Sequence, residues 1–188
     1  MAVKKAKGKE WFTIIAPKIF NSMELGKTMS GNPESLIGRK IDVSLIDLTN
    51  DFNKYYMKFI FKIKSIQEDK AITEFCGSDC MRDYISRMIL RRIKRVDTVQ
   101  DLNTKDGITI RVKGLAIIRG SIKSSIRKTI RNKIKELVKA EVEDSTLDEF
   151  IEKIISDDTK NKILKETRKI YPVRNFEIRK TELMGPTK

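Results

Sequence analysis

Residues 108–138 read ITIRVKGLAIIRGSIKSSIRKTIRNKIKELV, and this stretch contains the two periodicities that decide the fold. Over 108–113 isoleucine and valine alternate with polar residues, which predicts a strand with one buried face. Gly114 predicts a β-bulge ahead of the apolar run at 115–118. From residue 122 onward, apolar residues recur every three or four positions, which predicts a long amphipathic helix. The chain therefore mixes sheet and helix.

The half of the chain before this stretch repeats the strand pattern. Alternation over 41–45 and over 57–63 predicts two strands, and a third, shorter strand follows at 71–76. The period then changes, because apolar residues between 81 and 89 fall on one face of a helix. Ser78 or Asp79 is the expected N-cap of this helix, since both side chains can accept a backbone hydrogen bond.

The rest of the chain is mostly helical. A strand is predicted at 96–102, with a turn at Asp106–Gly107, and Thr146 with Glu149 forms the pattern of a capping box ahead of a second helix. A third helix is expected over about 158–169 and a closing strand over 173–183.

These elements predict an α+β fold. Its core is a curved antiparallel sheet or is β-barrel-like, with one inserted helix and a C-terminal block of about three helices. Residues 1–10 are expected to be a flexible basic tail, and 11–188 a single α+β domain.

Composition points to a polyanionic partner. The 188 residues include 40 Lys and Arg against 26 Asp and Glu, a net charge of +14. Such an excess repels itself in a compact protein unless an anion neutralises it, and binding to nucleic acid releases counterions. An anionic membrane is the second candidate, but no apolar run approaches the roughly 20 residues of a membrane span. The absence of histidine removes most general bases and zinc sites.

The cations gather in the N-terminal tail, around the first helix and its exit, and along the long helix. No acidic residue interrupts 119–135, whereas a merely solvated helix face usually alternates Glu with Lys. Arginine dominates the group around the first helix and alternates with lysine along the long helix, and its planar fork suits phosphate oxygens. Lys123, Arg127 and Arg131 step by four and predict a ridge along the helix. The candidate residues for contact with RNA or DNA are Lys4, Lys5, Lys7, Lys9, Arg87, Arg91, Arg92, Lys94, Arg95, Arg119, Lys123, Arg127, Lys128, Arg131 and Lys135.

The sign of the charge inverts directly after this helix. Nine acidic residues lie between 136 and 158. A surface that contacts nucleic acid would not carry them, so they are expected to face solvent or a basic protein neighbour. This pattern indicates a component of a larger assembly.

Other chemistries find little support. Gly26-Lys-Thr28 resembles the end of a phosphate-binding loop, but Asn21 stands where the first glycine is required and 31–33 stop any following helix. Cys76 and Cys80 lack the further ligands of a zinc site. No catalytic residue, metal or cofactor is predicted. Trp11, with Phe12 and Phe20, is expected to anchor the N-terminal segment on the sheet, and base stacking beside the lysine-rich tail is the alternative.

Several stretches together resemble one family of ribosomal proteins. They are Trp11-Phe-Thr-Ile-Ile-Ala-Pro-Lys-Ile-Phe20, Gly26-Lys-Thr28, Gly38-Arg-Lys-Ile-Asp-Val-Ser-Leu-Ile-Asp-Leu48, Arg82-Asp83, Thr104-Lys-Asp-Gly107, Ile170-Tyr-Pro-Val173 and Ile178-Arg-Lys180. In this order they resemble the archaeal and eukaryotic small-subunit ribosomal protein family 3Ae, the eukaryotic-type protein one. The shorter tails favour its archaeal branch.

The resemblance implies a β-barrel-like core with appended helices on the platform of the small subunit. It implies contacts with ribosomal RNA, with neighbouring ribosomal proteins and with messenger RNA near its exit, and no enzymatic activity or cofactor. The expected function is therefore that of a structural constituent of the cytoplasmic ribosome that supports translation, with no membrane partner. The alternative is a free RNA-binding or RNA-processing factor that is not stably on the ribosome.

Overall fold

The computed structural model describes residues 8–186, with side chains up to Met184. The described chain divides after Gly77 into two compact units, called unit 1 and unit 2 here. Lys4, Lys5 and Lys7 of the predicted tail lie outside the described residues, and Glu10 already begins the first strand.

Unit 1 is built mainly from strands. Its elements are β1 (Glu10–Ile15), η1 (Lys18–Phe20), β2 (Glu24–Ser30), η2 (Pro33–Leu36), β3 (Lys40–Ser44), α1 (Leu45–Thr49), η3 (Phe52–Lys54), β4 (Met57–Gln67) and most of β5 (Lys70–Cys80). β1 pairs antiparallel with β2 and parallel with β5, while β4 pairs with β3 and β5. The strands predicted at 57–63 and 71–76 are confirmed as parts of β4 and β5, and the strand predicted at 41–45 is confirmed up to Ser44, because Leu45 already begins α1. β1 and β2 were not predicted.

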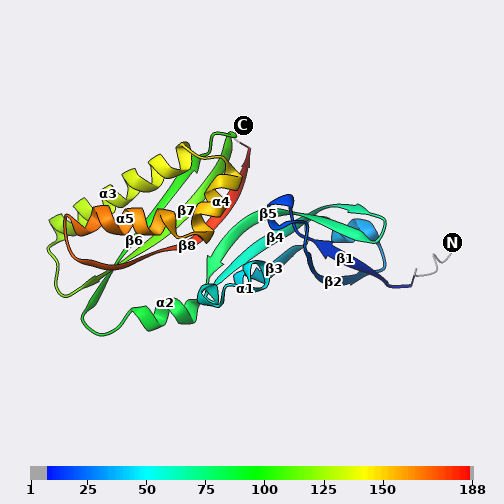
Figure 1. Ribbon diagram of the computed structural model, residues 1–188, viewed down its shortest axis with the longest axis horizontal. Helices are drawn as coiled ribbons and strands as arrows, with labels where there is room; N and C mark the ends of the chain where they lie inside the picture. Colours follow the sequence, from blue (N-terminus) through cyan, green and yellow to red (C-terminus); the bar gives the residue numbers. More distant parts are fainter. Residues whose placement is uncertain (1–7, 187–188) are drawn as a thin grey trace, which may run out of the picture. The chain divides into compact units, whose positions relative to one another are not determined.

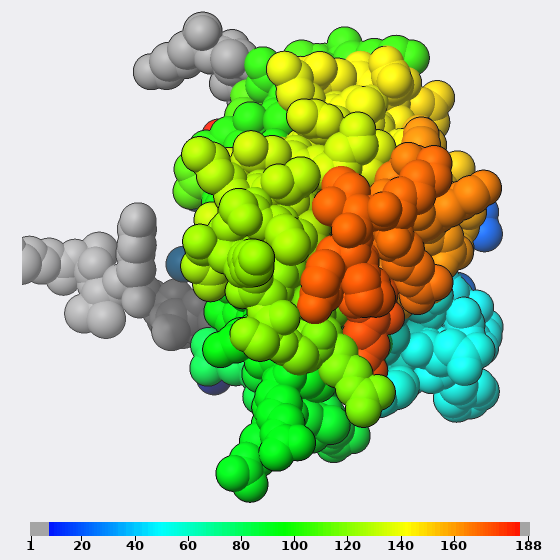
Figure 2. Space-filling view, turned by 90° about the vertical axis from the view of Figure 1, so that its left-hand side faces the viewer, coloured from blue at the N-terminus to red at the C-terminus, as the bar shows by residue number. Residues whose placement is uncertain are grey.

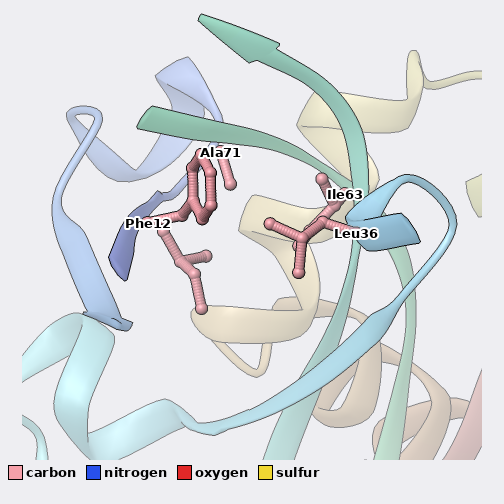
Figure 3. Close-up of a cluster of buried hydrophobic side chains, with 5 residues drawn as sticks. Phe12, Leu36, Ile63 and Ala71 are labelled. Atoms are coloured by element: carbon pink, nitrogen blue, oxygen red, sulfur yellow. The ribbon is translucent and has the colours of Figure 1, made fainter. Parts of the chain in front are cut away.

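The core of unit 1 collects one face of each strand. Phe12, Ile14, Leu36, Ile63 and Ala71 form a buried cluster, and Figure 3 shows these side chains converging between the strands. A second group packs edge to face, with Phe20 contacting Phe59 and Phe61 and both of these contacting Phe75. Edge-to-face aromatic pairs add about 0.5–1.5 kcal/mol each beyond the area they bury.

Unit 2 combines helices with a sheet made of three long strands and the end of β5. Its elements are the end of β5, then α2 (Arg82–Met88), β6 (Ile93–Asn103), β7 (Ile108–Arg119), α3 (Ser124–Glu143), α4 (Leu147–Ile155), α5 (Asp158–Arg168) and β8 (Val173–Pro186). β7 is the central strand and pairs with β6 and β8. Figure 1 shows α3, α4 and α5 together on one side of these strands. The inserted helix and the C-terminal block of three helices are thus confirmed.

Gly114 makes close packing possible in the centre of this sheet. The β7–β8 register shifts between Lys113 and Gly114, so the predicted bulge is confirmed. A Cβ on Gly114 would lie 2.7 Å from Thr98 Oγ1 and 3.1 Å from the Phe176 ring. No other residue fits between these side chains without displacing them.

The sequence also predicted two local structures around the helices, one of which is wrong. The capping box of α4 is confirmed, because Thr146 Oγ1 accepts from the Glu149 amide and Glu149 Oε2 accepts from the Thr146 amide. Capping of α2 by Ser78 or Asp79 is wrong, because β5 continues to Cys80. The Ser78 amide donates instead to Thr181 Oγ1 of β8, which keeps this residue in the sheet.

The α+β class is confirmed, and of the two forms expected for the sheet the open one is found. The expectation of an antiparallel sheet is wrong where β1 pairs with β5, because these two strands run parallel. In neither unit do the described strands close into a barrel. Among the described residues, no helix is both long enough and apolar enough to cross a membrane.

Candidate nucleic-acid interface

The strand register of unit 2 brings three loops to one end of the sheet. Ile93 at the start of β6 lies opposite Arg119 at the end of β7. Ile118 in turn lies opposite Val173, at the start of β8. The turns before β6, after β7 and before β8 therefore meet, although their residues are separated by up to about 80 positions in the chain.

An open cleft of about 810 Å³ lies at this end of the sheet, here called the arginine cleft. Its lining comprises Leu90, Arg91, Arg92, Ile93, Arg119, Gly120, Pro172, Val173 and Arg174. Four of the nine residues are arginines and none is acidic. A concave surface lined by charges of one sign focuses the field on a ligand of the opposite sign.

Hydrogen bonds hold the backbone of the arginine cleft in place. The Gly120 amide donates to the Arg92 carbonyl at 3.0 Å, and both residues have positive φ, 87° and 65°. Arg168 Nε donates to the Val173 carbonyl at 3.2 Å. Neither bond uses the side chain of an arginine that lines the cleft, so these side chains remain available for a ligand.

The four arginines of the cleft have no carboxylate partner among the described residues. The ion pairs of unit 2 lie elsewhere, for example between Arg111 and Asp101, where Nε–Oδ1 is 2.6 Å. Burying or crowding guanidinium groups without a counter-charge is unfavourable. An external polyanion would supply that charge through fork-shaped hydrogen bonds to phosphate oxygens.

The sequence identified three of these four residues. Arg91, Arg92 and Arg119 were candidates, and the structure brings them together although 27 positions separate Arg92 from Arg119. Arg174 was missed. It stands alone in the sequence, so no charge run marks it, and only the register of β7 with β8 would have placed it beside the others.

The beginning of α3 presents further cations. Lys123 is the N-cap residue, and Arg127 and Lys128 are exposed. The first turn contains no acidic residue, so nothing in it offsets the positive end of the helix dipole. Figure 2 shows the outer side chains of α3, in yellow-green, running along unit 2 beside those of α5, in orange.

The ridge predicted along α3 winds round the helix. Each step of four residues overshoots a full turn by about 40°. Arg131 therefore reaches the sheet, where its Nε donates to the Asp97 carbonyl of β6 at 3.2 Å. Lys135 is half-buried, and its carbonyl accepts from Gln100. These two residues are tied to β6, unlike Arg127.

The other candidates are exposed but spread out. Arg87 lies on α2 and Lys94 on β6, while Arg95 forms an ion pair with Asp97 at 2.8 Å. Lys9 precedes β1 in unit 1 and is exposed. None of these four lines the arginine cleft.

A second basic cleft of about 460 Å³ lies beside α2 and β8 and was not predicted. It is lined by Asp79, Cys80, Arg82, Ile85, Ser86, Arg95, Lys113, Arg179 and Lys180. Glu182 offsets part of this charge, since it contacts Lys113 at 2.7 Å and Lys180 at 2.9 Å. Hydrogen bonds from these two lysines lower the pKa of Glu182 from 4.5 to about 2.

The same cleft contains a thiol with a shifted pKa. Burial raises the pKa of the Cys80 thiol to about 12, and the negative charges of Glu177 and Asp79 raise it further.

One carboxylate of the acidic region at 136–158 is buried inside unit 2. Most carboxylates between 136 and 158 are exposed, but Glu141 is buried against Lys153, at 3.4 Å, and Lys162. Burial alone would raise the pKa of Glu141, but the hydrogen bond from Lys162 and the two positive charges outweigh it and lower the pKa. The prediction of a solvent-facing or partner-facing carboxylate is wrong for this residue, because α5 and α4 supply its counter-charges.

The structure also places the residues considered for other chemistries. Gly26-Lys-Thr28 lies within β2, and Thr28 accepts a hydrogen bond from Arg39. Cys76 and Cys80 are free thiols. Within residues 8–186, no group of three or more Cys, Asp or Glu side chains is arranged to hold a metal ion.

An α+β protein with an open cleft lined by four arginines and no acidic residue has the features of a protein that binds a polyanion. The chain matches the model of the ribosomal S3Ae family over residues 1–186 and belongs to that family.

Archaeal relatives agree with this assignment. The chain is 36% identical to the small ribosomal subunit protein eS1 of Sulfurisphaera tokodaii over 96% of this chain and 93% of the relative. It is 38% identical to eS1 of Saccharolobus islandicus, over 96% of this chain and 86% of the relative. For eS1 of Desulfurococcus amylolyticus the values are 37%, 96% and 84%. The resemblance seen in the sequence is confirmed.

Proposed function

We propose that this protein is a structural constituent of the small ribosomal subunit that binds ribosomal RNA through the arginine cleft of unit 2. The carrying observation is the convergence of Arg91, Arg92, Arg119 and Arg174 without a carboxylate partner among the described residues. The cytoplasmic ribosome is its expected place of action, and no reaction is assigned to it.

The acidic surface of α3 and α4 fits a second class of partner. Glu143, Asp144, Asp148 and Glu152 are exposed and lie on a part of the chain that would repel RNA. A basic ribosomal protein is the complementary neighbour. The family resemblance supports a position on the platform of the subunit, close to messenger RNA, as part of this proposal.

Co-sedimentation tests the proposal. Native extract separated on a gradient should place the protein in the small-subunit fraction, and a variant with Arg119→Ala and Arg174→Ala should shift toward the top. A wild-type protein found only in free fractions would contradict the proposal and favour the free RNA-binding or RNA-processing factor.

A further inference from the structure

The single tryptophan of the chain lies on the outer face of unit 1. Side chains alternate between the two faces of a strand. Phe12 therefore points into the core and is 2% exposed, whereas Trp11 points outward and is 60% exposed. The predicted anchoring role is therefore wrong for Trp11, although Phe12 and Phe20 are buried. Indole is the largest apolar side chain, and nothing described in unit 1 covers it.

The neighbours of Trp11 continue an apolar surface with basic flanks. Met29 of β2 lies directly opposite Trp11 and is 43% exposed. Residues directly opposite in an antiparallel pair have Cβ atoms about 4.5–5.5 Å apart on the same face. The next pair on this face joins Thr13 to Lys27, and on its other side Thr13 lies opposite Lys70 of β5.

The charge close to Trp11 on this face is positive, and the exposed carboxylate that β2 adds to the face, Glu24, lies at the far end of the pairing, opposite Ile15. Lys27 and Lys70 are both exposed, and Lys9 precedes Trp11 by two residues on the same alternation. The acidic residue next to Trp11, Glu10, belongs to the opposite alternation, and the exposed Asp69 lies in the turn before β5. An apolar platform rimmed by lysines matches a base attached to phosphates better than it matches an apolar peptide.

We propose that Trp11 and Met29 form a stacking platform for an unpaired base of RNA, with Lys27 and Lys70 contacting the adjoining phosphates. This proposal rests on RNA being the ligand of the protein, as proposed above, and adds a contact in unit 1. Stacking on an aromatic ring tolerates any base, because every base has a π-face. The polarizable thioether of Met29 extends the apolar surface beside the indole.

Because the chain contains one tryptophan, its tryptophan fluorescence, excited at the red edge where tyrosine does not absorb, reports on this position alone. The full-length protein is titrated with a short single-stranded RNA and with an abasic ribose-phosphate oligomer of equal length. The RNA should quench Trp11 emission, and the abasic oligomer should bind without quenching. Equal quenching by both ligands, or quenching by neither, would overturn the proposal.

Affinity measurements with variants give an independent readout. Trp11→Ala should weaken single-strand binding by about 5- to 150-fold, the range for losing one stacked base. Trp11→Phe should restore most of the affinity because it keeps a ring. Phe52→Ala removes another exposed aromatic, 80% exposed in η3, and should leave affinity unchanged. Wild-type affinity for Trp11→Ala, or an equal loss for Phe52→Ala, would refute the platform.

The two proposals fail separately. Trp11→Ala should change affinity with the salt dependence intact, since a base contact releases no counterions. A smaller salt dependence of binding in the arginine variants tests the arginine cleft of unit 2 and leaves the stacking proposal untouched. If small-subunit proteins quench Trp11 while RNA does not, the platform is a protein-docking surface and the stacking proposal is wrong.

Discussion

Neutralising the arginine cleft should lower the salt dependence of RNA binding by a calculable amount. Each cation that neutralises a phosphate contributes about 0.7–0.9 to the slope of log K against log salt concentration. Arg91, Arg92, Arg119 and Arg174 would together contribute about 2.8–3.6 if each contacts one phosphate. The double variant with Arg119→Ala and Arg174→Ala should therefore lose about 1.4–1.8 of the slope.

The chain offers a matched control for this change. Arg111 lies on the same strand as Arg119, and Lys169 follows α5, but each is already paired, with Asp101 at 2.6 Å and with Glu166 at 2.7 Å. Arg111→Ala with Lys169→Ala removes the same net charge and should leave the slope nearly unchanged. Filter binding of small-subunit RNA at a series of salt concentrations measures both variants. Equal losses of slope would mean that net charge, and not the cleft, drives binding.

Three further predictions concern stability and reactivity. Ile130 of α3 is fully buried, so Ile130→Ala should lower the free energy of unfolding in denaturant by about 2–5 kcal/mol, whereas exposed Arg127→Ala should change it by less than about 1 kcal/mol. Because the folded pKa of Glu182 lies near 2, below 4.5, this carboxylate stabilises the fold above pH 4.5, and the contribution is lost as the pH falls toward 2. Urea titrations should show a shallower acid limb for Glu182→Gln, and an unchanged limb would contradict the ion-pair geometry. Burial and its raised pKa should keep Cys80 unreactive toward a thiol reagent at neutral pH until the protein unfolds. Half-buried Cys76 should react first. Labelling of Cys80 in the native protein, read by mass spectrometry, would refute this.

Local sequence patterns predicted the elements whose signal depends on nearby residues, such as the apolar period of a strand or the motif of a helix cap. The alternation at 108–113 and the capping box at Thr146 both appear in the structure, because each depends on residues within a few positions. β1 was missed because the apolar patch at 11–16 does not alternate strictly, and β2 was missed because Leu25 and Met29 are its only large apolar residues. Ser78 was misassigned because its partner, Thr181, is 103 residues away.

The same distinction separates the cations that the sequence could identify from those that it could not. Charge density along the chain marked Arg131, yet this side chain is bound to the Asp97 carbonyl. It overlooked Arg174, which has no acidic neighbour in the cleft and lies beside residues some 55 to 80 positions earlier. A folded chain ties some of its cations into internal hydrogen bonds and ion pairs, and the remaining cations are the ones available to contact a polyanion. Which cations remain available depends on strand register, and strand register is a long-range property. For this reason the arginine cleft could not be located from the sequence, although three of its four arginines were identified as candidates.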